Sequence, residues 1–185
     1  MSTQGHKWKT KKHGAEYRRQ WRKVHIGIDA ETLEIRAIEV TSNRVGDAQV
    51  LPDLLNQIPQ EERIDSVSGD GAYDTKRDHT AIAERNAETI IPVRKNGKPW
   101  KENTLGAQAR NETLRAMQRL GRAIWKKWSG YHRRSLVETK MRCFKLLGER
   151  VNARLFNSQA AELQIRATLL NRFTRLGRPV TVAIP

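Results

Sequence analysis

Asp70 is the acidic residue whose surroundings best suit chemistry, because the strand-like run SVSG precedes it and Gly71 follows it. A glycine beside a carboxylate lets the backbone turn tightly or approach a ligand. Open α/β sheets carry their sites at the carboxyl ends of strands, which is where Asp70 is expected. Asp-Gly is also a common turn signal, so a plain turn is the alternative interpretation.

Glu138 belongs to a group of four side chains at helical spacing. Tyr131, Arg134, Glu138 and Lys145 are separated by three, four and seven residues, and on a helix such spacings place side chains within roughly 60° of one another. A carboxylate among cations suits a site in which the acid holds a divalent metal ion and the cations hold phosphates. The alternative is a solvated helix face with an Arg134–Glu138 pair worth about 0.3 kcal/mol.

The charge distribution favours a polyanion as partner. The 185 residues include 35 Lys and Arg against 20 Asp and Glu, a formal net charge of +15. The net charge is +7 over 1–25, −8 over 26–93, +13 over 94–154 and +3 over 155–185. Two basic segments thus flank an acidic middle, which predicts a nucleic-acid surface around an acidic site. A generally basic surface kept for solubility, or a ribosome-associated protein, is the alternative.

Composition also argues against several classes of protein. With 37% hydrophobic and 30% charged residues, the chain suits one globular domain rather than a disordered one. No stretch approaches the roughly eighteen apolar residues of a membrane span, and the N-terminus lacks the apolar core of a secretory signal. A single cysteine, Cys143, excludes an internal disulfide and a cysteine zinc site, so we expect a reducing, cytoplasmic setting.

The elements that must position these residues alternate between strand and helix. A hairpin is expected first, followed by a helix, a strand, a second helix and a strand, at 24–28 with 35–40, 47–58, 64–69, 75–86 and 89–93. Asp29 is expected to serve the hairpin turn and Asp47 to cap the first helix. This order indicates a mixed α/β fold with a parallel crossover. The remainder is expected to be helical, at 111–128, 131–147 and 157–176.

The segment before the hairpin interleaves basic and aromatic residues. Cations there can contact phosphates, and the side chains that we predict to bind DNA are Lys9, Lys11, Lys12, Arg22 and Lys23. The aromatic residues Trp8, Tyr17 and Trp21 either stack on bases or pack on the core, and the sequence leaves both interpretations open.

The spacing Tyr131-x2-Arg134-x3-Glu138-x6-Lys145 resembles the signature of DDE transposases of the insertion-sequence IS-four and IS-five groups. The chain as a whole most resembles the IS-five family. Further similar segments are DGAYD at 70–74, WRKVH at 21–25, IPVRK at 91–95 and GYHRRS at 130–135. The likeness extends over nearly the whole chain.

This resemblance implies an α/β, RNase H-like fold, a mixed sheet with flanking helices and a helical C-terminal part. It implies a two-metal enzyme, dependent on Mg²⁺ or Mn²⁺, that nicks transposon ends and joins the freed 3′-OH to target DNA. Asp70 and Glu138 would be catalytic metal ligands, and Tyr131, Arg134 and Lys145 would position the DNA backbone. The partners implied are double-stranded DNA of terminal inverted repeats and target, and a homo-oligomer at synapsis, in the bacterial cytoplasm and on the nucleoid.

The sequence departs from the family at the first catalytic aspartate. In the family this residue lies on the first, central strand, upstream of the segment that Trp8 and Lys9 resemble, yet no aspartate here precedes Asp29. We therefore expect an N-terminally truncated, inactive transposase without its central strand, divided into a basic segment at 1–23, a partial RNase H-like domain at 24–176 and a tail at 177–185. A non-catalytic DNA-binding or dimerising remnant is the main alternative, and an unrelated RNA-binding protein is a third.

Overall fold

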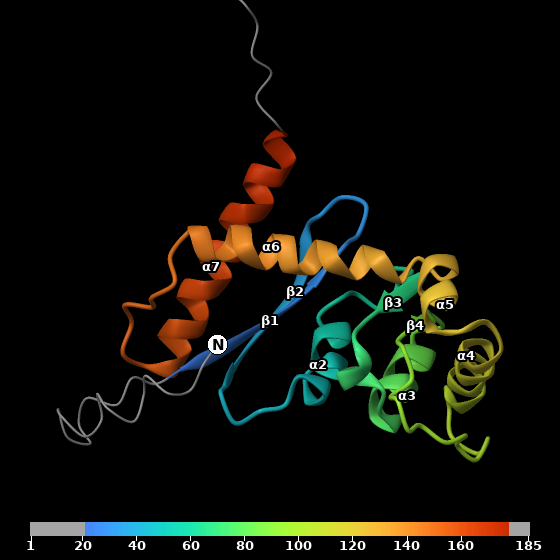
Figure 1. Ribbon diagram of the computed structural model, residues 1–185. Coiled ribbons are helices and arrows are strands. Elements are labelled where there is room, and N and C mark those ends of the chain that lie inside the picture. Colours follow the sequence, from blue (N-terminus) through green and yellow to red (C-terminus); the bar gives the residue numbers. More distant parts are fainter. Residues whose placement is uncertain (1–20, 178–185) are drawn as a thin grey trace, which may run out of the picture.

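The strands of this computed structural model, which describes residues 21–177, form two small sheets. β1 (Arg22–Ile28) pairs with β2 (Ile35–Ser42) in an antiparallel hairpin. β3 (Ser66–Ser68) and β4 (Glu88–Ile90) pair in parallel. The expected hairpin and parallel crossover are thus confirmed, and the mixed α/β arrangement is visible in Figure 1.

The hairpin turn is closed by the Asp29 side chain. Its Oδ1 accepts hydrogen bonds from the backbone N–H groups of Glu31 at 2.7 Å and Thr32 at 2.8 Å. These two bonds hold the pKa of Asp29 below its usual range, because they favour the ionised form. The expected turn role of Asp29 is confirmed.

The helices and 3₁₀ turns follow one another in chain order: η2 (Asp47–Gln49), α2 (Leu51–Asn56), η3 (Gly71–Tyr73), α3 (Lys76–Glu84), α4 (Ala107–Leu120), α5 (Arg122–Trp128), η4 (Tyr131–Arg134), α6 (Ser135–Leu146) and α7 (Phe156–Leu176). Helix α3 begins where the Thr75 hydroxyl accepts a hydrogen bond from the Asp78 N–H. None of the helices between residues 21 and 177 combines the length and apolar character that crossing a membrane requires.

Three details of the expected helices were wrong. The helix expected at 111–128 is two helices, because Gly121 adopts φ 82°, a conformation outside the helical region. The helix expected from Tyr131 begins as the 3₁₀ turn η4 and becomes α-helical only at Ser135. Asp47 caps no helix: it lies inside η2, and its carboxylate instead accepts a hydrogen bond from Lys23 Nζ at 3.2 Å.

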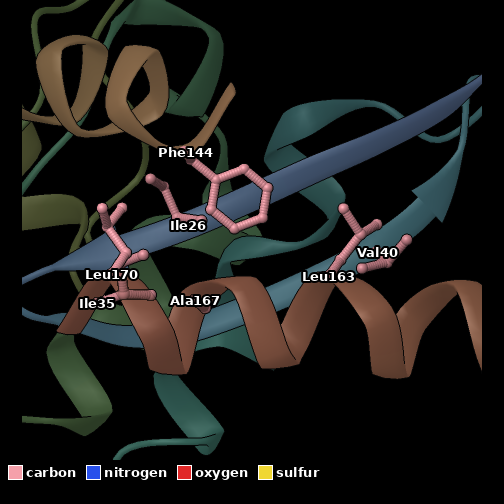
Figure 2. Close-up of a cluster of buried hydrophobic side chains, with 7 residues drawn as sticks. All are labelled: Ile26, Ile35, Val40, Phe144, Leu163, Ala167 and Leu170. Atoms are coloured by element: carbon pink, nitrogen blue, oxygen red, sulfur yellow. The ribbon is translucent and has the colours of Figure 1, made fainter. Parts of the chain in front are cut away.

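Two main apolar clusters form the core. The first joins the hairpin to α6 and α7, as Figure 2 shows, through Ile26, Ile35, Val40, Phe144, Leu163, Ala167 and Leu170. The second joins α2 and α3 to the parallel sheet through Leu51, Leu55, Ile82 and Ile91. A smaller cluster around Ala37, Val50 and Leu54 lies between β2 and α2. The protein therefore has two packing centres, one around each sheet.

Helix α6 connects these two halves. Its body packs on β1, while η4, directly before it in the chain, packs on β3. Figure 1 shows α6 running across the molecule from the side of β3 and α5 toward α7. Within residues 21–177, β1 and β3 each pair with a single strand. The same helical unit therefore covers two sheets that are not joined to each other.

Candidate functional site

Asp70 lies at the N-terminus of η3, just after β3. Its Oδ1 accepts a hydrogen bond from the Ala72 N–H at 2.8 Å, and the side chain is exposed. The other carboxylate oxygen makes no hydrogen bond to residues 21–177, which leaves it available to a ligand. A Cβ on Gly71 would lie 3.4 Å from the Pro92 carbonyl oxygen, so the turn runs close to the chain after β4.

Glu138 lies in the first turn of α6 and is also exposed. Its Oε1 accepts a hydrogen bond from Arg134 Nη1 at 3.0 Å. The Arg134 guanidinium in turn lies 5.2 Å from the centre of the Tyr131 ring, a cation–π distance. The Tyr131 ring is buried against Trp125, with ring centres 5.8 Å apart. The three motif residues Tyr131, Arg134 and Glu138 thus form one chain of contacts.

The fourth motif residue, Lys145, lies in the last turn of α6 and is exposed. Its ammonium group makes no ion pair or hydrogen bond with the part of the chain that the structure describes. Lys145 is therefore free to contact a phosphate, about two helical turns from Glu138.

The elements next to the two acidic residues are in contact with each other. Asp70 follows β3, and η4, which packs on β3, leads directly into the α6 turn that carries Glu138. In Figure 1 the N-terminal end of α6 lies beside β3. Nevertheless, no group of three or more His, Cys, Asp or Glu side chains within residues 21–177 is arranged to hold a metal ion.

Two of the basic residues expected to bind DNA make contacts within the protein. Arg22 donates from Nε to Gln159 Oε1 at 2.7 Å. Lys23 donates from Nζ to the Val45 carbonyl at 2.9 Å and pairs with Asp47. These contacts attach β1 to α7 and to the loop after β2. Lys9, Lys11 and Lys12 lie outside the described residues.

The Asp70 turn is an acidic neighbourhood. Turn η3 packs on η2, which brings Asp47 toward the same place. Burial, reinforced by the negative charges of Asp47, Asp70 and Asp78, raises the pKa of Tyr73 to about 12. Burial is the larger cause of this shift, and the three carboxylates add to it.

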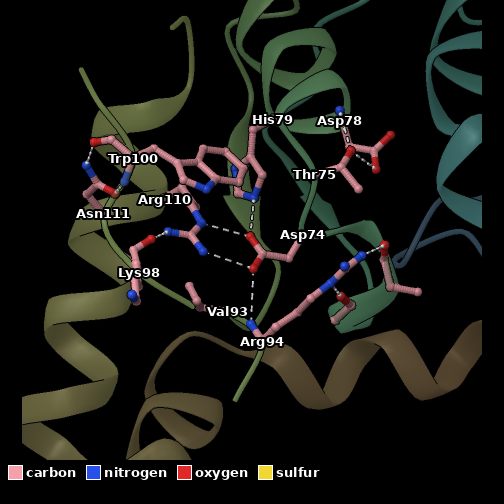
Figure 3. A network of polar contacts seen from close by, with 12 residues as sticks. Asp74, Thr75, Asp78, His79, Val93, Arg94, Lys98, Trp100, Arg110 and Asn111 are labelled. Carbon is pink, nitrogen blue, oxygen red and sulfur yellow. Dashed lines mark hydrogen bonds and ion pairs between the residues drawn. The ribbon is translucent and has the colours of Figure 1, made fainter. Parts of the chain in front are cut away.

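A buried polar network lies next to this turn, and sequence reasoning did not identify it (Figure 3). The Asp74 carboxylate accepts hydrogen bonds from Arg110 Nε at 2.9 Å and Arg110 Nη2 at 3.2 Å, and from the Arg94 backbone N–H at 3.0 Å. His79 Nε2 lies 3.3 Å from the same carboxylate. Burial alone would raise the pKa of Asp74, but the close contact with His79 and the hydrogen bonds from Arg110 and Arg94 outweigh it and hold that pKa well below its usual range.

The network reaches back to the Asp70 turn through the Arg94 side chain. Its Nε donates to the Gly71 carbonyl at 3.1 Å and its Nη2 to the Ala72 carbonyl at 3.0 Å. The only signal for this in the sequence was that the segments 70–74 and 91–95 both resemble the transposase family. Their contact depends on the parallel pairing of β3 with β4, which spacing alone does not reveal.

Comparison with known protein families gives a match over most of the chain. A family model described as the transposase DDE domain matches residues 1–172. The chain belongs to the transposase DDE domain family. No solved structure matches it significantly.

Proposed function

We propose that this protein is an insertion-sequence transposase of the IS-five family that carries out metal-dependent DNA strand cleavage and strand transfer at transposon ends. The observation that carries the proposal is the family match over residues 1–172, together with the packing of the Glu138 helical unit against the strand that leads to Asp70. Its partners are the double-stranded DNA of terminal inverted repeats and of the target, and a second copy of the chain at synapsis. We expect it to be located in the bacterial cytoplasm, bound to the nucleoid.

The two acidic residues suit Mg²⁺ or Mn²⁺, because hard divalent ions prefer carboxylate oxygens. One oxygen of each of Asp70 and Glu138 is hydrogen-bonded within the protein, and the other has no partner among residues 21–177. When bound, a pair of ions supplies stabilisation of the attacking and leaving oxygens in phosphodiester chemistry. Asp70 and Glu138 would hold the ions, while Arg134 and Lys145 would hold the DNA backbone. Tyr131, whose ring is buried, would hold the Arg134 guanidinium in place through the cation–π contact.

On this proposal Asp70 and Glu138 would be two of the three acids that a DDE site uses, and no three-donor group is present within residues 21–177. The third acid would be carried by a strand between β1 and β3, which lie under the same helical unit and pair with one strand each. Among residues 21–177, β1 and β3 thus each have an edge without a strand partner, as would be expected of an RNase H-like sheet without its central strand. We therefore expect the described residues alone to bind DNA but not to cleave it.

The absence of a three-donor group within residues 21–177 also favours a second candidate function. In this alternative the chain is a non-catalytic remnant that binds DNA or forms mixed complexes with a complete transposase. It would bind duplex DNA in a salt-sensitive way without metal-dependent nicking.

The test is nicking of a supercoiled plasmid that carries terminal inverted repeats, in Mg²⁺ or Mn²⁺, with Asp70→Ala, Glu138→Ala and the control Glu149→Ala. Glu149 is exposed and makes no ion pair with the described residues. If the chain cleaves, we expect Asp70→Ala and Glu138→Ala each to lower the nicking rate at least about 100-fold, because each removes a metal ligand. Glu149→Ala should nick at the wild-type rate. DNA binding without nicking, unchanged in Glu138→Ala, would establish the non-catalytic alternative instead.

A further inference from the structure

We propose that Arg94 is a positioning residue for Asp70, and that it is itself fixed by the buried Asp74–Arg110 pair. The role of Asp70 as a metal ligand rests on the proposed function, whereas the geometry that fixes the Asp70 turn does not. Helix α4 would thereby determine how firmly the protein presents the Asp70 carboxylate.

The first step of the inference is the contact between Arg94 and the turn. The guanidinium donates to the carbonyls of Gly71 and Ala72, the two residues that follow Asp70. The Ala72 N–H donates to Asp70 Oδ1 at 2.8 Å. Ala72 is therefore held on its carbonyl side by Arg94 and on its N–H side by Asp70. A planar guanidinium holds its donors in a fixed fork that suits two neighbouring carbonyls, whereas an ammonium group on a flexible stem offers no such fixed geometry.

The second step is the anchor that fixes Arg94. Its backbone N–H donates to Asp74 Oδ2, and the Asp74 side chain, only 2% exposed, is held by two bonds from Arg110. Figure 3 shows Asp74 between the Arg110 guanidinium on one side and the Arg94 backbone on the other. A buried ion pair with its hydrogen bonds satisfied holds its two partners in one geometry.

The third step is that α4 fixes the whole loop between Arg94 and Trp100. Arg110 Nη1 donates to the Lys98 carbonyl at 2.6 Å, and the Arg110 guanidinium lies 4.1 Å from the Trp100 ring. The Asn111 side chain donates to the Trp100 carbonyl and accepts from the Trp100 N–H, each at 2.8 Å. The loop is thus attached to α4 near its far end and to Asp74 at its beginning.

The Asp70 turn depends on the bonds from Arg94 because few hydrogen bonds within η3 hold it. Within η3 the backbone bonds run from the Tyr73 N–H to the Asp70 carbonyl at 3.1 Å and from the Asp74 N–H to the Gly71 carbonyl at 3.3 Å. A single 3₁₀ turn with two such bonds opens readily in solution. The Tyr73 carbonyl accepts a further backbone bond from the Thr75 N–H at 2.8 Å, so the two bonds from Arg94 are added to three backbone bonds on the carbonyls of this turn.

The test compares Arg94→Gln with Arg85→Gln in the full chain. Arg85 is a matched control, because its guanidinium also donates to backbone carbonyls, those of Leu55, Ile58, Pro59 and Glu62, away from the Asp70 turn. Three quantities are measured: the free energy of unfolding, the exchange rate of the Ala72 amide proton by NMR, and the affinity for Mn²⁺ by electron paramagnetic resonance.

We expect Arg94→Gln to accelerate exchange of the Ala72 amide about 10-fold and to weaken Mn²⁺ binding about 10-fold. Arg85→Gln should lower stability while leaving the Ala72 amide and Mn²⁺ affinity as in the wild type. Arg94→Lys should behave like Arg94→Gln, since it restores the charge without the planar fork.

An unchanged Ala72 exchange rate in Arg94→Gln, an equal acceleration in Arg85→Gln, or full recovery in Arg94→Lys would each overturn the proposal. If the wild-type chain binds no Mn²⁺, the metal site of the proposed function fails, but the Ala72 exchange rates still decide whether Arg94 positions the turn.

Discussion

At the scale of single residues, Asp74 is the side chain on which most of the polar network depends. Its carboxylate is almost completely buried, and it receives bonds from Arg110 and from the Arg94 backbone. Burial removes the hydration of both charges, and within the pair each charge partly compensates the other for that loss. A buried charge whose partner has been removed has no such compensation. Asp74 is therefore more important to stability than its position in a turn suggests.

We expect Asp74→Asn to lower the free energy of unfolding by about 3–5 kcal/mol, because it leaves the Arg110 guanidinium buried without its counter-charge. Urea denaturation at pH 7 measures this. Asp65→Asn is the control, since Asp65 pairs with Arg63 on the surface with 80% and 89% of the two side chains exposed. That change should leave stability nearly as it was. Equal effects of the two substitutions would contradict the importance assigned to burial.

The low pKa of Asp74 also predicts how stability depends on pH. Its pKa is lower in the folded protein than in the unfolded chain, where it is about 3.9. The stabilisation is therefore complete above about pH 4 and is lost as the pH falls toward the folded-state pKa. Urea denaturation between pH 2 and pH 7 should show the gap between wild type and Asp74→Asn narrowing below about pH 4. A gap that widens on acidification would contradict this sign.

At the scale of elements, the two ends of α4 require glycine for different reasons. Gly106 precedes α4 with φ 80°, and Gly121 follows it with φ 82°. A Cβ on Gly106 would lie 2.4 Å from the backbone oxygen of His79, whereas none of the described atoms beyond the neighbouring residues comes within 4 Å at Gly121. Both positions disfavour a side chain, but only Gly106 is also in close contact with α3.

Gly121→Ala should therefore cost about 1–3 kcal/mol of stability, because φ 82° combined with ψ 151° is a conformation that residues other than glycine essentially do not adopt. Gly106→Ala should cost at least about 2–3 kcal/mol, because α3 and α4 must also move apart to admit the methyl group. Thermal or urea denaturation of the two variants makes the comparison. A loss of only about 1 kcal/mol in Gly106→Ala, the cost of the left-handed conformation alone, would indicate that α4 tolerates displacement at its N-terminal end.

The sequence predicted the elements with strong local signals. The hairpin alternates apolar residues around the Asp29 turn, and α3 begins with the Thr75 cap, so both could be expected. The Gly121 break was not predicted, although a glycine within a helical pattern was visible in the printed sequence. The Asp74–Arg110 contact joins residues 36 positions apart, and it depends on how α4 packs against α3. No pattern of spacing encodes that packing, so the polar network could be found only in three dimensions.

At the scale of the whole molecule, the charge distribution predicts how the protein binds duplex DNA. A chain of net charge +15 with its cations concentrated in 94–154 should release counterions when it binds. The logarithm of the affinity should then fall linearly with the logarithm of the salt concentration, by about 0.9 for each phosphate contacted. Fluorescence anisotropy with a labelled duplex measures this slope.

Lys145→Gln should reduce the magnitude of that slope by about 1, because its ammonium group is free for one phosphate. Arg63→Gln removes an equal charge from the acidic segment 26–93 and should leave the slope unchanged. An equal reduction of the slope by both variants would mean that only the total charge of the protein affects DNA binding, and that the exposed end of α6 does not contact DNA.

The attachment of α7 to the hairpin has a consequence for synthesis on the ribosome. The Asn171 side chain bonds both the N–H and the carbonyl of Ile35, 136 positions earlier in the chain, and Leu163, Ala167 and Leu170 complete the first apolar cluster. Translation at about 5–20 residues per second places the two partners roughly 7–27 s apart. During that interval the apolar face of the hairpin lacks the α7 residues that bury it. The nascent chain is therefore most accessible to chaperones and proteases just before α7 is synthesised.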